Sequence, residues 1–160
     1  MPPLHPALVH FPIALVAFSF VTDLLGRFFN KPSLRSAGFW SLIGALIGGA
    51  LTAVTGYYDF SRATLGDTAK YADFHMDLGF ILIGCVVVAL TVWRWLVYAR
   101  RDVAPGLPYL IAASLVVGLT LFQGWYGGEM VYSQGAGVAA AGKGTEPATT
   151  GKQRLDRVTR

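Results

Sequence analysis

Four long apolar stretches constrain the fold of this chain more than any other feature of its sequence. They cover approximately residues 7–28, 37–58, 78–98 and 107–130. Each can cross the roughly 30 Å hydrocarbon core of a bilayer, which takes about 20 helical residues. With 54% hydrophobic and only 14% charged residues among 160, the chain has nothing soluble that would bury four such helices. The sequence therefore predicts an integral membrane protein.

Short segments connect these stretches, and short connections favour antiparallel neighbouring helices. We expect an all-α, up-down-up-down four-helix bundle over residues 1–132. The tail, residues 133–160, is rich in Gly, Ala and Thr, and we expect it to be disordered because it has little apolar surface to bury. Small residues at spacings of three or four along the second stretch predict close helix packing. They are Ser41, Gly44, Gly48, Thr52, Thr55 and Gly56.

The charges between the stretches predict an orientation. Lys and Arg dominate the connections after the first and third stretches, whereas Asp dominates the connection between the second and third. Because positively charged loops stay in the cytoplasm, we expect both chain ends on the outer side of the membrane. The net charge of +4 is explained in this way, so no nucleic-acid partner is expected. The basic residues concerned are Arg27, Lys31, Arg35, Arg94, Arg100 and Arg101.

Titratable residues gather at the other end of the predicted bundle. His5 and His10 flank the start of the first stretch, and His75 precedes the third. Since the first and third helices run in parallel, His10 and His75 should lie at a similar depth. Two imidazoles from different helices are the axial ligands of a six-coordinate b-type haem. We therefore expect His10 and His75 to bind haem, with His5 as a substitute ligand.

Other residues near this level complete the predicted haem site. Gly56 and Gly79 could leave room for the macrocycle, Arg62 or Lys70 could pair with its propionates, and Trp125 could line it. Three histidines allow only one bis-histidine haem in the chain. On this interpretation the protein is a small electron-transfer subunit in the lipid bilayer. Its partner is either a redox protein or further copies of the same chain in a homo-oligomer.

Two further interpretations remain open. The same end could bind a transition metal, with nitrogen and oxygen ligands drawn from His5, His10, His75, Asp59 and Glu129. Alternatively, the histidines only cap helix ends, and the protein is a cofactor-free scaffold or partner-binding subunit. No Ser-His-Asp order, phosphate-binding loop or metalloprotease motif occurs, so an enzyme is not expected.

Two charged residues lie inside the apolar stretches, toward the basic connections. Asp23 belongs to the first stretch and Arg94 to the third. An unpaired charge in hydrocarbon costs about 2.5–3.5 kcal/mol or more, so each side chain must either reach the interface or find a partner. The sequence is compatible with an ion pair between Asp23 and Arg94 and with two separate interfacial side chains.

Motifs at both ends of the chain resemble one family. His5-Pro6-Ala7-Leu8-Val9-His10-Phe11-Pro12-Ile13 opens the first stretch, His75 precedes the third, and Gly127-Gly128, Val131-Tyr132 and Gly135 close the fourth. Over about residues 4–138 the chain resembles the bacterial membrane proteins called DUF2231. The resemblance implies a four-span inner-membrane protein. Domains of this family occur beside redox modules, which favours the haem interpretation, but the family implies no particular activity.

Overall fold

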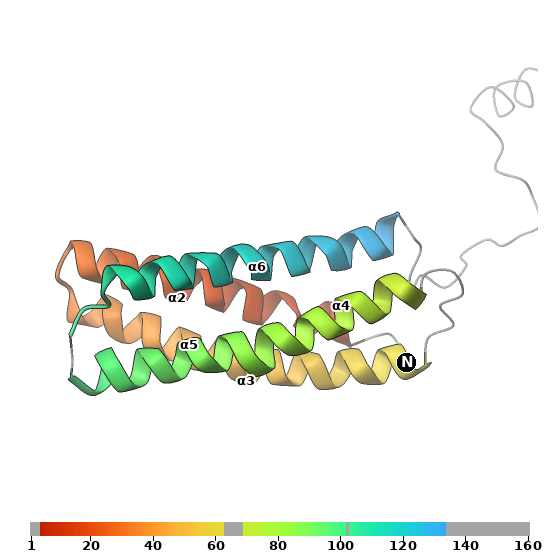
Figure 1. Cartoon of the computed structure of the whole chain (residues 1–160), viewed down its shortest axis with the longest axis horizontal. Helices are drawn as coiled ribbons and strands as arrows, with labels where there is room; N and C mark the ends of the chain where they lie inside the picture. Colours follow the sequence, from red (N-terminus) through yellow and green to blue (C-terminus); the bar gives the residue numbers. More distant parts are fainter. Residues whose placement is uncertain (1–3, 63–68, 102, 134–160) are drawn as a thin grey trace, which may run out of the picture.

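The computed structural model describes residues 4–62, 69–101 and 103–133, so the predicted tail from residue 134 lies outside the described residues. Four long helical stretches run along one another, and each is long and apolar enough to cross a membrane. The start of the first and the end of the fourth lie at the same end of the molecule (Figure 1). This arrangement confirms the predicted all-α, up-down-up-down bundle.

Each stretch consists of one or more helical elements. The first contains α1 (His5–Leu8) and α2 (His10–Phe28), and the second is α3 (Pro32–Arg62). The third begins with α4 (Ala69–Ile81), the π-helical segment η2 (Leu82–Val87) and α5 (Val88–Trp93). It ends with the π-helical segment η3 (Arg94–Tyr98) and the 3₁₀ turn η4 (Ala99–Arg101), and the fourth stretch is α6 (Leu107–Tyr132).

The third helix begins earlier than the hydropathy pattern indicated. It starts at Ala69 rather than near residue 78, because Lys70, Asp73 and Asp77 lower the local hydropathy without interrupting the helix. As a result His75 lies within a helix and not in the loop that precedes it. Its side chain therefore has a direction set by the helix, which matters for the site described below.

Two local features shape the first two helices: a break near the start of the first helix and a tight turn after α2. Pro12 has no N–H to donate to the carbonyl of Leu8, and the first helix is interrupted nearby, at Val9. After α2 the chain reverses through Asn30, whose φ of 50° is left-handed. There the N–H of Lys31 donates to the carbonyl of Gly26 at 3.0 Å, and the N–H of Asn30 to that of Arg27 at 3.4 Å, as in a Schellman turn.

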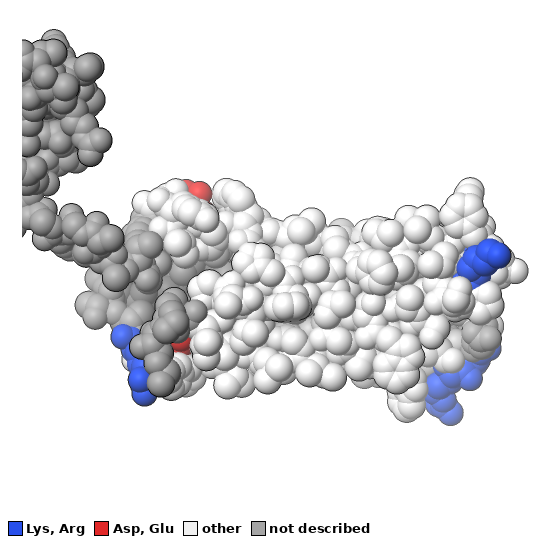
Figure 2. All heavy atoms as spheres, turned by 180° about the vertical axis from the view of Figure 1, so that it is seen from behind, with Lys and Arg blue, Asp and Glu red and all other residues white. Residues whose placement is uncertain are grey.

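The core of the bundle is apolar and is shared by all four stretches. Val16, Leu42, Leu90 and Val116 are buried together in it. Many other large apolar side chains are exposed on the outside of the helices, where a lipid bilayer would solvate them. Charged atoms lie at the two ends of the molecule on the face that Figure 2 shows, with none between them.

Glycines allow α2 and α3 to approach closely. A Cβ on Gly44 would lie 3.2 Å from Leu15, and one on Gly48 would lie 3.5 Å from Pro12. In addition, the hydroxyl of Ser19 donates to the carbonyl of Gly38 at 2.7 Å. The small residues of the second stretch thus pack against the first stretch within the same chain.

We call the end that contains the α2–α3 turn and the turn before α6 the basic end. Asp23 and Arg94 pair just inside it: Nε and one terminal nitrogen of Arg94 donate to the two carboxylate oxygens at 2.9 and 2.8 Å. The exposed fractions of the two side chains are 0% and 2%. The same terminal nitrogen of Arg94 also donates to the carbonyl of Arg35 at 2.9 Å, so the arginine joins three of the four stretches.

Candidate functional site

The opposite end of the bundle, which we call the histidine end, places His5 against α3. The ring Nδ1 of His5 lies 2.9 Å from the carbonyl oxygen of Thr52. The backbone N–H of His5 donates to the carboxylate of Asp59 at 2.9 Å. A Cβ on Gly56 would lie only 2.7 Å from His5 Nδ1, so the ring needs a glycine at position 56. Three contacts with one helix therefore fix both the backbone and the ring of His5.

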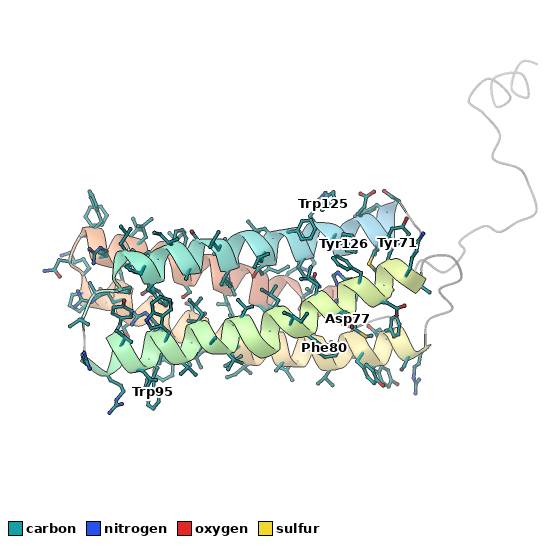
Figure 3. The ribbon with its side chains drawn as sticks, in the orientation of Figure 1. Tyr71, Asp77, Phe80, Trp95, Trp125 and Tyr126 are labelled. Atoms are coloured by element: carbon teal, nitrogen blue, oxygen red, sulfur yellow. The ribbon has the colours of Figure 1, made fainter. Side chains whose placement is uncertain are left out.

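His75 brings a second imidazole to the same place from α4. The ring centroids of His5 and His75 are 6.1 Å apart and their planes are perpendicular, at 89°. His75 also stacks on Tyr126 of α6, with centroids 6.2 Å apart and planes 9° from parallel. Figure 3 shows Tyr126 between α6 and α4. A Cβ on Gly127 would lie 2.8 Å from Cε1 of His75, so this ring also packs against a glycine.

Two buried polar atoms at this end have no hydrogen-bond partner within the described part of the chain. One is Nδ1 of His75, and the other is the side-chain oxygen of Gln123. The amide nitrogen of Gln123 donates to the carbonyl of His75 at 2.7 Å, which holds α6 beside α4. A buried polar atom without a partner costs about 1–3 kcal/mol. The site therefore has unused capacity to bind a ligand or an ordered water.

The hydrogen bond of His5 determines which of its nitrogens can bind a metal. A carbonyl only accepts, so Nδ1 of His5 must carry the proton, and in a neutral ring the lone pair is then on Nε2. Metal-binding histidines commonly donate their second ring nitrogen to a backbone carbonyl in this way. Two imidazoles on opposite sides of one metal ion, each bonded at about 2.0–2.1 Å, have ring centroids roughly 6 Å apart. The centroids of His5 and His75 are separated by a similar distance, 6.1 Å, with the rings in a T-shaped contact.

Several residues predicted to share the site lie elsewhere. His10 is exposed at the start of α2, and Glu129 is exposed on α6. Trp125 is 61% exposed and points away from the bundle (Figure 3). The guanidinium of Arg62 lies over the ring of Tyr58, 4.3 Å from its centroid. The structure therefore pairs His5, rather than His10, with His75.

The glycines predicted to make room for the macrocycle have more specific neighbours. Gly56 faces the ring of His5, and a Cβ on Gly79 would lie 3.1 Å from the amide nitrogen of Gln123. Within residues 4–62, 69–101 and 103–133, no group of three or more His, Cys, Asp or Glu is placed to hold a metal ion. Asp59 contacts the backbone of His5, not its ring. A site at this end would thus have two imidazole ligands.

Sequence reasoning missed the three residues that position the histidines: Thr52, Gln123 and Tyr126. One signal was present, because Gln123, Tyr126 and Gly127 are spaced at i, i+3 and i+4 and must share one face of α6. A glutamine within an apolar stretch also requires a partner. The role of Thr52 had no signal in the sequence, because its backbone carbonyl makes the contact.

Comparison with protein families places the whole bundle in a single family model. A model described as "Predicted membrane protein (DUF2231)" matches residues 1–140, which include all four helical stretches and the histidine end. The searches of curated proteins and of solved structures gave no match.

Proposed function

The chain belongs to the DUF2231 family of predicted membrane proteins. We propose that this multi-pass membrane protein is a small electron-transfer subunit that binds one b-type haem between His5 and His75. The observation that carries this proposal is the geometry of the two imidazoles. They come from different helices, their centroids are 6.1 Å apart, and one of them already donates its second nitrogen to a carbonyl. Bound haem would supply a one-electron redox centre.

Each neighbouring residue has a separate role in this proposal. The carbonyl of Thr52 sets the tautomer of His5, and Asp59 anchors its backbone. Tyr126 and Gly127 fix the ring plane of His75 from the side of α6. These contacts pre-orient both imidazoles and lower the entropy lost when a ligand binds. In this proposal His10, which is exposed, is not a haem ligand.

Optical spectroscopy of the purified protein reconstituted with haem tests this function. We expect a Soret band with bis-histidine character in the wild-type protein. It should be lost in both His5→Ala and His75→Ala, and retained in His10→Ala, which also separates the two candidate ligands on the first stretch. A wild-type protein without a Soret band after full reconstitution would contradict the proposal, as would a band that survives in both single variants.

Two adjacent glycines provide a matched pair for the same experiment. Gly127→Val should displace His75 and abolish the band, because the ring already lies within 2.8 Å of the position of a Cβ. Gly128→Val should retain it, since nothing lies within 4 Å of a Cβ there. Both variants carry the same change in helix propensity, so a difference between them reports on His75. Equal spectra for the two variants would argue against this site.

A second candidate function is a cofactor-free scaffold, and one observation favours it. His5 makes polar contacts with Thr52 and Asp59 of the same chain, so this histidine already ties α1 to α3 without a ligand. On that interpretation the wild-type protein has no Soret band, and His5→Ala lowers its melting temperature instead. Metal analysis of the same sample identifies the third possibility, a metal held by the two imidazoles without haem.

We further propose that the basic end faces the cytoplasm of a bacterial inner membrane and that the histidine end faces outward. Among the described residues, the basic end contains one acid, Asp23, which is paired with Arg94. The positive-inside rule therefore favours this orientation. In a Cys85→Ala background, a membrane-impermeant maleimide added to intact cells should label Asp77→Cys and not Lys31→Cys. The reverse pattern would contradict the orientation.

A further inference from the structure

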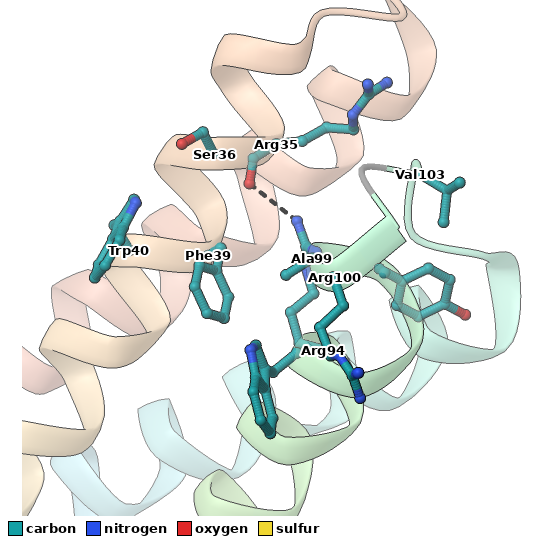
Figure 4. Close-up of a pocket in the computed structure, with 10 residues that line it drawn as sticks. Arg35, Ser36, Phe39, Trp40, Arg94, Ala99, Arg100 and Val103 are labelled. Carbon is teal, nitrogen blue, oxygen red and sulfur yellow. Dashed lines mark hydrogen bonds between the residues drawn. The ribbon is translucent and has the colours of Figure 1, made fainter.

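A cavity of about 290 Å³ opens between α3 and the end of the third stretch at the basic end. Figure 4 shows its walls, which include Ser36, Phe39 and Trp40 from α3 and Arg94 and Arg100 from the third stretch. No Asp or Glu is among the described residues that line it. The cavity therefore offers positive charge and hydrogen-bond donors, and its described lining contributes no carboxylate that would repel an anion.

At the floor of the cavity the charge of Arg94 is already paired, whereas at the mouth the charge of Arg100 can attract a ligand. Arg94 is buried, and its charge is balanced by Asp23. The carbonyl of Arg35 accepts a hydrogen bond from Arg94 across the cavity, as the dashed line in Figure 4 shows. Arg100 is exposed at the mouth, with its guanidinium 5.5 Å from the centroid of the Trp95 ring. This cation–π contact orients Arg100 without neutralising it.

The side chains at the mouth are well suited to an oxyanion. The guanidinium of Arg100 and the indole nitrogens of Trp40 and Trp95 can only donate hydrogen bonds. Both tryptophans are exposed, at 66% and 49%, as is typical of side chains at the level of lipid headgroups. A phosphate at this level could accept hydrogen bonds from Arg100 and from the indole of Trp95 beside it.

A second cavity, of about 240 Å³, continues from the first toward the middle of the bundle. It shares Phe39 and Trp95 with the first and is further lined by Ile43, Thr91 and Val92. Ile43 lies one turn deeper than Phe39 along α3, and Thr91 lies one turn deeper than Trp95 along the third stretch. The two cavities form a groove that is basic at its mouth and apolar at its inner end.

We infer that this groove binds one anionic phospholipid. The phosphate lies at the mouth beside Arg100 and Trp95, and an acyl chain extends along Phe39, Ile43 and Val92. A small soluble anion would fill only the mouth, and a neutral lipid would leave Arg100 without an ionic partner among the residues that the structure describes. The charge of the mouth and the apolar continuation together therefore select an amphiphile with a negative headgroup.

Lipid retention measured by native mass spectrometry tests the inference. The full chain is reconstituted into nanodiscs of phosphatidylcholine that contain a minor fraction of phosphatidylglycerol, then released into detergent. We expect the wild-type protein to retain phosphatidylglycerol in preference to phosphatidylcholine. Arg100→Gln should weaken the retention of phosphatidylglycerol about fivefold, since one arginine near the surface contributes roughly that factor. Arg100→Lys, which keeps the charge, should restore most of it.

Control variants separate the headgroup, the acyl chain and the general effect of a lost charge. Arg62→Gln removes a similar exposed arginine that lies over an aromatic ring at the other end, and it should change nothing. Val92→Trp fills the deeper cavity and should lower the retention of phosphatidylglycerol while the mouth remains intact. The inference is overturned if Arg62→Gln and Arg100→Gln lose lipid equally. It is also overturned if soluble glycerol phosphate displaces the lipid at equal concentration, because the acyl chain would then contribute nothing.

Discussion

Replacing Arg94 by Met is expected to lower the free energy of unfolding by about 3–5 kcal/mol, the largest effect that we predict for a single substitution in this chain. Asp23 is 0% exposed, and the change would leave its buried carboxylate without the guanidinium that pairs with it. The Arg35 carbonyl would also lose the hydrogen bond that joins α3 to the third stretch. Unfolding in mixed micelles of increasing SDS content, followed by circular dichroism, measures the loss.

A double variant shows whether the pair or a single charge is responsible. Asp23→Leu combined with Arg94→Met removes both charges and substitutes apolar side chains, so it should cost clearly less than Arg94→Met alone. The difference between the double variant and the sum of the single variants is the coupling energy. If the effects of the two substitutions simply add, the ion pair contributes no coupling, and a buried unpaired charge is not the cause of the loss.

Gly38→Ala should produce the second large loss of stability, about 1–3 kcal/mol. A Cβ at position 38 would lie 2.5 Å from a carboxylate oxygen of Asp23 and 3.1 Å from the carbonyl oxygen of Ser19. Because the second of these atoms belongs to the backbone, α2 and α3 would have to separate. The same SDS titration measures the change, and the Ser19 hydrogen bond to Gly38 should weaken with it.

Gly118→Ala is the control for this substitution. Gly118 also lies within a membrane-spanning helix, but nothing is within 4 Å of the position of its Cβ. Alanine has the better helix propensity, so this variant should be neutral or more stable by up to about 1 kcal/mol. Equal destabilisation by the two variants would mean that close contact at Gly38 is not the cause.

The sequence was sufficient for the fold because the bilayer reduces the problem. Four stretches of sufficient length, joined by short connections, leave a helical bundle as the natural arrangement, since unsatisfied backbone groups are too costly in hydrocarbon. The start of the third helix was harder to predict. Lys70, Asp73 and Asp77 lower the hydropathy there, but helical hydrogen bonding tolerates exposed charged side chains beyond the hydrocarbon core.

The candidate site was predictable only in part, because it depends on the rotation of each helix about its axis. His5 and His10 are five residues apart, which is about 140° around a regular helix, so they cannot face the same partner. The interruption at Val9 adds a further rotation that no local pattern specifies. Trp125 and Tyr126 are separated by about 100°, and only Tyr126 reaches His75.

The sequence by itself determined that the chain has four membrane-spanning helices, that its histidines gather at one end, and that Asp23 and Arg94 lie near the other. Hydropathy and charge are properties of individual residues, and they fix depth in the bilayer. Only the tertiary structure decided that Asp23 binds Arg94, that His5 rather than His10 faces His75, and that Gly56 and Gly127 accommodate the two rings. These choices follow from how the helices rotate and pack against one another, and that depends on contacts between residues far apart in the chain.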